Sequence, residues 1–457
     1  MKENTSNKIF AIIIIFLFIG TSFFSVSASL FTDNHIKTDI ANEQISGLKD
    51  IFFDLKMAIL RRLALYPSLS AYIINDDKVT WSNGYGFYDL DNRKSATENT
   101  IYNVASISKT ITGTALMQLY DQGLFDLDED VNNYLPFNLR NPNFPDDPIT
   151  FRMLLSHSSS LNIDSSEYYW LNFSADPPFS SYPYPWLKEH LIPGGKWYYS
   201  DRWSSAYQPG EYSMYANVNF ELVCYLVELI SGENFLDYCK EHIFYPLEMY
   251  NTSFNLSELN IDNVAIPYHY HNGEYLQINE LSYMLGESTP PDKYWRMRMY
   301  PAGGLYTTVS DLSHFFIAHI NGGVYNGVRI LKEETVEEMH RLQPPGNFDP
   351  NTASYYGLAW IIEINPYGFN VNITGHSGGF YGVHTWMYYI PSENIGVVYF
   401  TNGDKIYERN ILLRAIPGFI TIISLYRKGG FKLFSEIDSI GTFYKHPRLH
   451  GNPFLFN

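Results

Sequence analysis

The segment NVASISKTITGT, residues 103–114, places a serine and a lysine three positions apart. At that spacing Ser106 and Lys109 share one face of a helix, where an amine can take the hydroxyl proton and make the serine a nucleophile. The spacing alone is not specific, because SGLK repeats it at Ser46 and Lys49. Taken alone, such a pair is a helix N-cap and a solvated lysine. The surrounding elements must separate the two interpretations.

The two serines differ in the helices that they begin. Apolar residues every three or four positions predict a helix from Ser106 to Gln122, ended by Gly123. Ser106 would then lie at a helix N-terminus, where free N–H groups and the helix dipole favour developing negative charge. Ser46 lies at the start of an amphipathic helix predicted from Ile45, with no cleft-forming context around it. The predicted surroundings therefore favour Ser106 over Ser46 as the nucleophile.

Strand-like segments occur towards both ends of the chain. One hairpin is predicted with its turn at Asp76-Asp77, and another with an Asn272-Gly273 turn. A second helix is predicted over residues 219–231, ended by Gly232, and an apolar helix over 408–425. The strands predicted in the last third are GLAWIIEI, FNVNITGHSG, HTWMYYI and IGVVYFTN.

Composition excludes several classes of protein. Apolar residues make up 45% of the 457 positions and charged residues 17%, so the chain is globular and long enough to bury a core. A net charge of −17 without a Lys/Arg stripe disfavours nucleic acid as a partner.

His269 and His271 alternate on one strand face, but a third ligand is lacking, so no metal site is expected. The only cysteines, Cys224 and Cys239, are expected as buried free thiols, with a single bridge left open.

The N-terminus has the pattern of a secretory signal. MKENTSNK carries two lysines, an apolar run follows, and Val26-Ser27-Ala28 is a small-residue cleavage pattern. We expect a signal peptide at residues 1–28, cleaved after Ala28. The alternative is an uncleaved segment that associates with the membrane. Either outcome makes the remainder extracytoplasmic, as a secreted or an anchored protein.

Several motifs occur together in a fixed order. They are GYGFYDL, NVASISKTITGTALMQLYDQGLFDLDEDV, MLLSHSSSL, YSMYANVNFELVCYLVELISG, PAGGLYTTVSDLSHF and GHSGGFYGVHTWMYYIP. This ordered set resembles the class C-like branch of the serine β-lactamase and penicillin-binding-protein superfamily over about residues 45–425. That branch includes esterases, D-amino-acid peptidases and DD-carboxypeptidases. The resemblance implies an α+β fold, an antiparallel sheet flanked by helices with an inserted, mostly helical subdomain. The catalytic domain would span 40–425, followed by a tail at 426–457.

The resemblance also implies roles for individual residues. Ser106 and Lys109 match the Ser-x-x-Lys pair, and Tyr215 and Asn217 match a Tyr-x-Asn motif. Ser106 would be the nucleophile, and either Lys109 or Tyr215 would take its proton, which requires that nearby positive charge and, for the lysine, burial lower the pKa of that group. Asn217 would hold Lys109 and a substrate carbonyl.

The third motif lies in GHSGG. His376 would donate to the tyrosine oxygen or to a substrate carboxylate, and Gly378 and Gly379 would let the substrate lie along the strand. Gly379 N–H and Ser106 N–H would form the oxyanion hole. His376 stands where β-lactamases have lysine, so we expect little lactam hydrolysis. Ser160 replaces a turn glycine of the family.

The expected function is acyl transfer through an acyl-serine, with no metal or organic cofactor. The substrate would be an ester or amide, small or peptidic, and the aromatic stretch 161–209 would form the rim of its site. His157 is expected to be a structural landmark rather than a ligand. The alternative function is a module that is acylated without turnover and serves as a sensor or scaffold.

Overall fold

The computed structural model describes residues 53–162, 186–280, 293–296, 299–349, 354–365 and 372–404. The chain divides into two compact units, Met1–Leu63 and Ala64–Asn457. In the first unit, residues 53–63 are helical, which confirms the described part of the amphipathic helix predicted from Ile45. The second unit contains the sheet and the candidate site.

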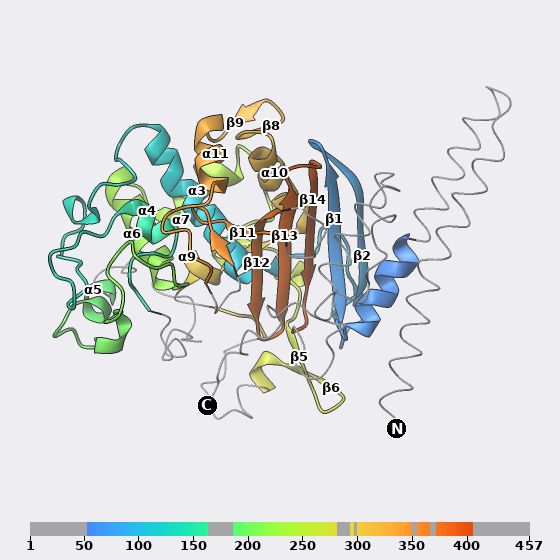
Figure 1. The fold of residues 1–457 in the computed structure, drawn as a ribbon. Coiled ribbons are helices and arrows are strands. Elements are labelled where there is room, and N and C mark those ends of the chain that lie inside the picture. The colour runs from blue at the N-terminus through green and yellow to red at the C-terminus, as the bar shows by residue number, and fades with distance from the viewer. Residues whose placement is uncertain are drawn as a thin grey trace. The chain divides into compact units, whose positions relative to one another are not determined.

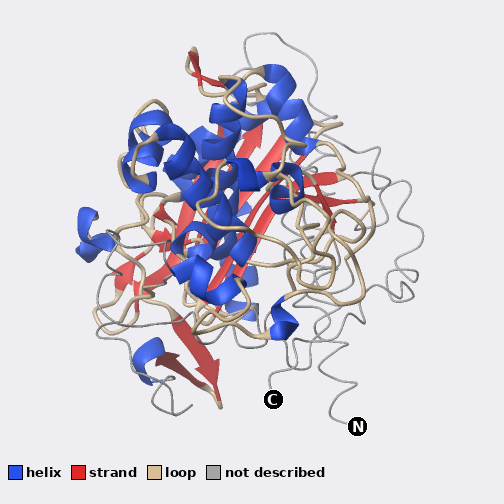
Figure 2. Ribbon diagram, turned by 90° about the vertical axis from the view of Figure 1, so that its left-hand side faces the viewer, coloured by secondary structure: helices blue, strands red, loops and turns tan. Residues whose placement is uncertain are grey.

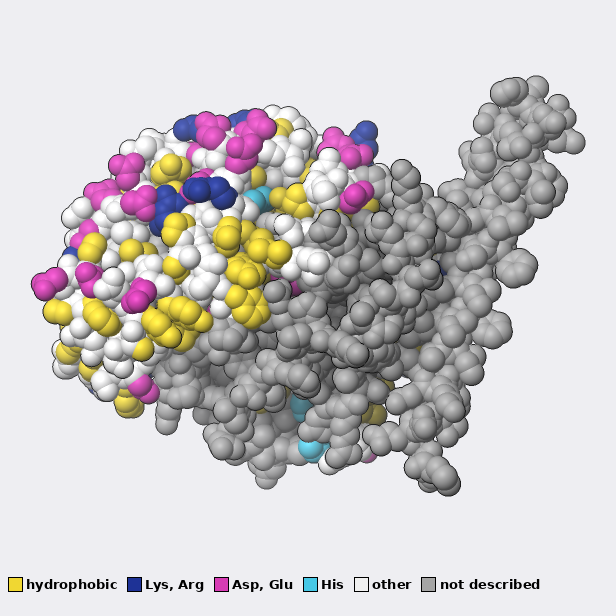
Figure 3. Space-filling model, viewed as in Figure 1, with side chains coloured by type: hydrophobic (Ala, Val, Ile, Leu, Met, Phe, Trp, Pro, Cys, Tyr) yellow, Lys and Arg dark blue, Asp and Glu magenta, His cyan; other side chains and the backbone are white. Residues whose placement is uncertain are grey.

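Some predicted features lie outside the described residues: the signal peptide at 1–28, the pair Ser46 and Lys49, the apolar helix at 408–425 and the tail at 426–457. Within the described ranges, no helix is both long and apolar enough to cross a membrane. On the face shown in Figure 3, acidic side chains are scattered over the described surface with a few basic ones among them. No continuous basic stripe is seen on that described part of the face.

The second unit contains an eight-stranded antiparallel sheet (Figure 1), with strand order β10-β11-β12-β13-β14-β1-β2-β3. Its strands are β1 Ser68–Asn75, β2 Lys78–Asp89, β3 Lys94–Ser95, β10 Tyr355–Tyr356, β11 Ile361–Glu363, β12 Ile373–Phe380, β13 Val383–Ile390 and β14 Ile395–Thr401. β1 pairs with β14, from Leu69 opposite Thr401 to Asn75 opposite Ile395. The sheet therefore joins early and late parts of the chain, as predicted.

The central strands are buried along their whole length. Every residue of β13 and β14 is buried, which explains why their sequences are nearly continuous apolar runs rather than alternating ones. One face packs against α10, Val309–Ile320, whose Phe316 ring lies 5.9 Å from that of Tyr389. A Cβ added at Gly396 would lie only 3.0 Å from Phe316, so the glycine lets helix and sheet approach closely.

Both predicted hairpins form. The β1–β2 turn contains Asp76 at a φ of 57°. β5 Tyr268–His271 and β6 Glu274–Gln277 are joined by Asn272 and Gly273, at φ values of 49° and 98°. Positive φ at both central residues is the geometry that Asn-Gly favours in a two-residue hairpin. Two shorter pairs are β4 Tyr102–Asn103 with β7 Tyr306–Thr307, and β8 Val324–Tyr325 with β9 Val328–Arg329.

Most helices lie in the chain between β4 and β12, which gives the predicted helical insertion and the α+β fold. Figure 2 shows helices gathered over the strands of the sheet. The α-helices described in this region are α3 Ser108–Asp121, α4 Phe151–Leu155, α5 Trp186–Leu191, α6 Val218–Ser231, α7 Phe235–Cys239, α9 Tyr300–Gly303, α10, and α11 Glu333–His340. Short 3-10 turns are Ala105–Ile107, Val131–Asn133, Ser200–Arg202, Leu256–Glu258 and Ile261–Asn263, and Lys240–Phe244 forms a π turn.

Helix α3 is the centre of the insertion. It is buried from Ser108 to Leu119 and packs against α6 and α9. The predicted ends are confirmed, since Gly123 follows α3 at a φ of 72° and Gly232 ends α6 at 75°. Cys224 on α6 and Cys239 on α7 are buried free thiols, so the open alternative of a bridge is not realised.

Candidate active site

Ser106 lies in the 3-10 turn Ala105–Ile107 that joins β4 to α3. Helix α3 begins only at Ser108, so the helix predicted from Ser106 starts two residues later than expected. Ala105 has a φ of 46°, in the left-handed region that residues with a side chain rarely adopt. Its N–H donates to Asn103 Oδ1 at 3.0 Å, which holds the sharp turn. Backbone strain beside a serine is typical of functional sites.

The predicted nucleophile and its two predicted partners meet at one oxygen. Ser106 Oγ accepts hydrogen bonds from Tyr215 OH at 2.8 Å and from Lys109 Nζ at 3.1 Å. Lys109 follows on α3, whereas Tyr215 comes from the segment before α6. Ser106 is not an N-cap, because the N-cap residue of α3 is Ile107 and no side chain caps that end. The cluster has the arrangement of an activated serine.

Lys109 is completely buried, so it is not a solvated lysine. Its Nζ donates to Ala302 O at 2.6 Å and lies 4.9 Å from the centre of the Tyr215 ring and 5.8 Å from that of Phe220. Carbonyl oxygen and aromatic faces thus replace water around the amine. Ala302 belongs to α9 in the motif PAGG, but a backbone carbonyl has no signature in residue type, so the sequence did not single it out.

Asn217 follows Tyr215 by two residues and is the N-cap residue of α6. Its half-buried side chain does not cap the helix. The role that the resemblance gives to Asn217, holding Lys109 and a substrate carbonyl, stays a prediction. The segment from Tyr215 to Asn217 is nevertheless on the same side of α3 as the nucleophile, because the Tyr215 hydroxyl contacts Ser106.

Strand β12 brings Gly378 against the turn that carries Ser106. A Cβ at Gly378 would lie 2.2 Å from Val104 O and 2.4 Å from Thr385 Oγ1. Only glycine therefore permits this contact between sheet and turn. A Cβ at the neighbouring Gly379 would meet no atom of the described residues within 4 Å, so a substrate could approach this position.

His376, also on β12, has a different state from the predicted one. Its Nδ1 lies 2.7 Å from Ser377 O, and because a carbonyl only accepts, Nδ1 carries the ring proton. Burial, and then the charge of Lys109, lower the pKa of His376 to about 3, so the ring is neutral at physiological pH. Nε2 is then an acceptor. The predicted role of His376 as a donor to Tyr215 or to a carboxylate does not fit this geometry.

His157 is closer to the site than the sequence indicated. Its Nδ1 accepts from Ala216 N–H at 3.1 Å, and its ring centre lies 4.4 Å from that of Tyr215. Burial is the main cause that lowers the pKa of His157 well below its ordinary value, and the charge of Lys109 adds to it. A neutral imidazole therefore supports Tyr215. Ser160, in place of the family's turn glycine, keeps a φ of 65°.

Other residues singled out in the sequence lie elsewhere. His269 Nδ1 contacts Asp404 Oδ2, and no group of three metal-ligating side chains occurs in the part of the chain that is described. In the aromatic stretch 161–209, residues 163–185 lie outside the described ranges. Trp203 is buried, with Nε1 donating to Leu191 O at 3.0 Å, so this tryptophan belongs to the core rather than to a rim.

Solved structures share this fold. The octameric penicillin-binding protein homologue from Pyrococcus abyssi superposes with a TM-score of 0.62 and 24% identity, covering 80% of this chain and 76% of that one. D-amino acid amidase from Ochrobactrum anthropi SV3, in a complex with L-phenylalanine amide, gives a TM-score of 0.62 and 20% identity, covering 82% and 99%.

Curated relatives match in sequence. Protein flp of Staphylococcus aureus (strain NCTC 8325 / PS 47) is 24% identical over 344 residues, which are 75% of this chain and 60% of the relative. Penicillin-binding protein 4* of Bacillus subtilis (strain 168) is 23% identical over 350 residues, covering 74% and 69%. The chain thus spans about 60% of the length of protein flp. The family model described as Beta-lactamase matches residues 58–415. The chain therefore belongs to the beta-lactamase family.

Proposed function

We propose that this protein is a serine hydrolase that acts on an ester or amide through an acyl group carried on Ser106. The observation that carries the proposal is the convergence of Lys109 Nζ and Tyr215 OH on Ser106 Oγ. A serine hydroxyl is a poor nucleophile until a neighbour takes its proton. Both candidate groups lie within hydrogen-bond distance, and this chemistry requires neither a metal nor an organic cofactor.

In the acylation step, a bond forms between Ser106 Oγ and the substrate carbonyl carbon while the serine proton passes to Lys109 or Tyr215. The carbonyl oxygen becomes negative, and the N–H groups of Ser106 and Gly379 form the proposed oxyanion hole, each such donor being worth roughly 3 kcal/mol in other hydrolases. The bond to the leaving amine or alcohol then breaks, and that group takes the proton. Water releases the acyl group by the same transfers.

The edge of β12 supports an extended substrate. Among the described residues, β11 pairs with β12 only from Ile373 to Gly375, so Ser377 to Gly379 have no strand beside them on that edge. An extended acyl chain can pair there by its backbone groups. Neutral His376 offers an acceptor, which favours a substrate N–H or amine over a carboxylate. The amidase relative crystallised with L-phenylalanine amide supports amino acid amides as the first compounds to test.

The proposed location is outside the cytoplasm. The lysine-flanked apolar segment and the Val26-Ser27-Ala28 pattern support a signal peptide at residues 1–28. N-terminal sequencing of the mature protein should then find Ser29 at or near its start. Retention of residues 1–28 would instead favour the membrane-anchored form.

A fluorophosphonate probe tests the nucleophile, since it reacts with activated serines. Mass spectrometry should find the probe on Ser106, and Ser106→Ala should remove both labelling and turnover of an ester or amino acid amide. Release of many equivalents of product supports a hydrolase. A burst of one equivalent with a stable acyl-protein would support the sensor or scaffold instead. A folded protein that is unlabelled, or labelled at Ser46, would refute the proposal.

A further inference from the structure

The segment that carries Tyr215 has no helix or strand of its own to fix it. Its backbone is held by partners from distant parts of the chain. Four consecutive N–H groups donate outward: Ser213 to Asn347 Oδ1 at 2.8 Å, Met214 to His157 O at 2.7 Å, Tyr215 to Asp349 Oδ2 at 3.0 Å and Ala216 to His157 Nδ1 at 3.1 Å. Two supports, one at His157 and one at 347–349, therefore set the position of the tyrosine.

Asp349 is the charged member of these supports. It is completely buried, and its Oδ2 accepts from Tyr215 N–H and from Tyr356 OH at 2.9 Å. Backbone hydrogen bonds between Asp349 and Ser354 fix the residue itself. Hydrogen bonds to a carboxylate are about twice as strong as neutral ones. One acceptor oxygen of Asp349 therefore holds both the Tyr215 backbone and the Tyr356 hydroxyl.

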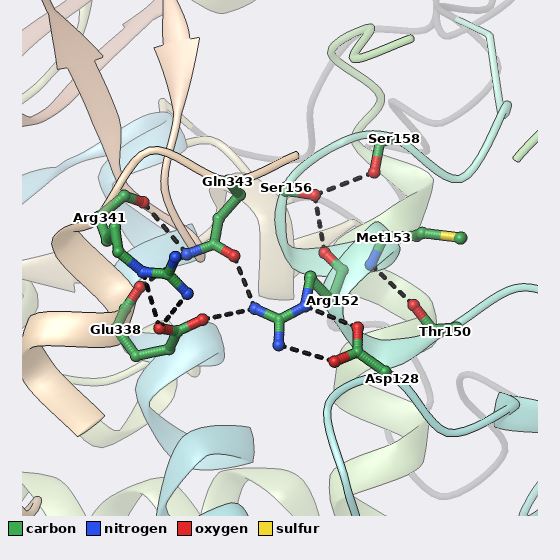
Figure 4. Close-up of polar contacts among 9 residues, drawn as sticks. All are labelled: Asp128, Thr150, Arg152, Met153, Ser156, Ser158, Glu338, Arg341 and Gln343. Carbon is green, nitrogen blue, oxygen red and sulfur yellow. Dashed lines mark hydrogen bonds and ion pairs between the residues drawn. The ribbon is translucent and has the colours of Figure 1, made fainter. Parts of the chain in front are cut away.

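Arg152 links the segment before His157 to the end of α11 (Figure 4). It lies on α4, five residues before His157, and its guanidinium reaches across to Glu338 on α11 and to Gln343 Oε1, at 2.7 Å from the latter. Nε and Nη2 also donate to Asp128 at 2.7 and 2.9 Å. The Asp128 hydrogen bonds are the largest cause of a raised pKa for Arg152, so Arg152 stays charged at any working pH. We call Arg152 with its partners Asp128, Glu338 and Gln343 the Arg152 clamp.

The Arg152 clamp acts on the segment that leads to Asp349. Gln343, the neutral partner of Arg152, donates through Nε2 to Glu338 O at 2.8 Å and to Arg341 O at 3.2 Å. Gln343, six residues before Asp349, is thus fixed both to the end of α11 and to Arg152 on α4. The Arg152 clamp thus links the segment before His157 to the segment that leads to Asp349, and it does so without contacting Ser106 or the Tyr215 hydroxyl.

We propose that Asp349 is a positioning residue, which holds the backbone of Tyr215 so that the phenol reaches Ser106 Oγ. The assignment rests on the proposed function, because it concerns the same acyl transfer. Asp349 acts through Tyr215, so its contribution exists only while the tyrosine hydroxyl is present. A displacement of about 1 Å in a reacting group can lower a rate by about 100-fold.

A double-mutant cycle on the full chain tests this role. The measured quantity is the second-order rate of fluorophosphonate labelling at Ser106. Asp349→Ala should lower it about 10- to 100-fold, and Tyr215→Phe about 10²- to 10⁴-fold. The double variant should label within about 3-fold of Tyr215→Phe alone, since residues that act as a unit are not additive. Asp349→Asn, which keeps an acceptor oxygen, should recover most of the rate.

Asp311 provides a matched control. It is buried on α10, and its Oδ2 accepts from Asn251 N–H at 2.6 Å and from Thr252 Oγ1 at 3.0 Å, so it resembles Asp349 but supports another turn. Asp311→Ala should lower the melting temperature and leave the labelling rate unchanged. If Asp349→Ala does not fold, Tyr356→Phe, which removes one donor to Asp349, replaces it in the cycle with a drop of about 3- to 10-fold expected.

The outcomes separate this proposal from the one on which it rests. Independent losses from Asp349→Ala and Tyr215→Phe, so that the double variant shows their product, would mean that Asp349 supports the fold only, while the serine hydrolase proposal would stand. Wild-type labelling in Tyr215→Phe would overturn the role of Asp349 and leave Lys109 as the group that takes the serine proton. No labelling at Ser106 in the wild type would overturn the hydrolase proposal and the role of Asp349 together.

Discussion

Gly378→Ala tests the contact between β12 and the turn that carries the nucleophile. The added Cβ would lie 2.2 Å from Val104 O, 2.4 Å from Thr385 Oγ1 and 3.0 Å from Ala105 Cβ. Two of these atoms belong to backbone or to the first atom of a side chain, so rotation of a flexible side chain cannot relieve the overlap. The turn must move away from the strand by about 1 Å to bring the 2.2 Å contact beyond 3 Å, a backbone shift of the kind that overpacking forces.

That movement has a structural and a chemical cost. Overpacking typically destabilises a protein by about 1–3 kcal/mol, and the retreat of Val104 O also breaks its hydrogen bond from Thr385 Oγ1, at 2.9 Å. In domains of about 150–250 residues, 1 kcal/mol lowers the melting temperature by roughly 2–4 °C. Ser106 lies two residues after Val104, so a shift of about 1 Å should lower its labelling rate about 100-fold.

Gly379→Ala is the matched control for the stability measurement. It makes the same chemical change one residue later, where an added Cβ meets no atom within 4 Å in the part of the chain that is described. Thermal unfolding should therefore distinguish the two variants, with Gly379→Ala melting like the wild type and Gly378→Ala several degrees lower. Fluorophosphonate labelling gives the second readout. If Gly378→Ala melts and labels like the wild type, the close packing of β12 on the Ser106 turn is wrong.

Three further predictions concern buried histidines and Lys109. In the folded protein burial holds the pKa of His376 and of His340 at about 3. As the pH falls below 6.5, the unfolded chain therefore binds protons at these histidines before the folded protein does. Each histidine should lower the free energy of unfolding by about 2 kcal/mol between pH 6.5 and 5, measured by urea unfolding at both pH values. Because His376 replaces the family's lysine, nitrocefin should be hydrolysed slowly or not at all, and rapid turnover that Ser106→Ala abolishes would contradict this. Lys109→Met should lower the labelling rate at least 100-fold while the melting temperature stays equal or rises.

Much of the fold could be predicted from short-range patterns. The Asn272-Gly273 turn, the glycines that end α3 and α6, and the apolar runs of β13 and β14 each have a local physical cause, so each was visible in the sequence. The meeting of Tyr215 with Ser106 was visible only through the resemblance, because the two residues are 109 positions apart. Order along the chain could therefore predict the partners of Ser106, but not their distances.

The remaining features depend on backbone atoms or on contacts between distant loops. Ala302 contributes a carbonyl to Lys109, and any residue type could do so. The proton on His376 Nδ1 follows from the position of Ser377 O, which depends on local backbone geometry. Asp349 lies 134 positions from Tyr215, in a segment with no regular pattern. Sequence patterns record periodicity and residue type, and these three features rest on neither.

The burial of Lys109 explains why the last of the predictions above combines lost reactivity with kept stability. Taking an amine out of water costs several kcal/mol, which a hydrogen bond or two only partly offsets, and Lys109 is completely buried on a helix whose other inward residues include Ile111 and Ala115. Selection for stability alone would place an apolar side chain at this position. Burial of Lys109 instead lowers the stability of the fold, and the contact of its Nζ with the oxygen of Ser106 gives a catalytic reason for the lysine at this position. A strong drop in melting temperature for Lys109→Met would show that the amine serves the fold, and the catalytic interpretation of the Ser-x-x-Lys pair would lose its main physical support.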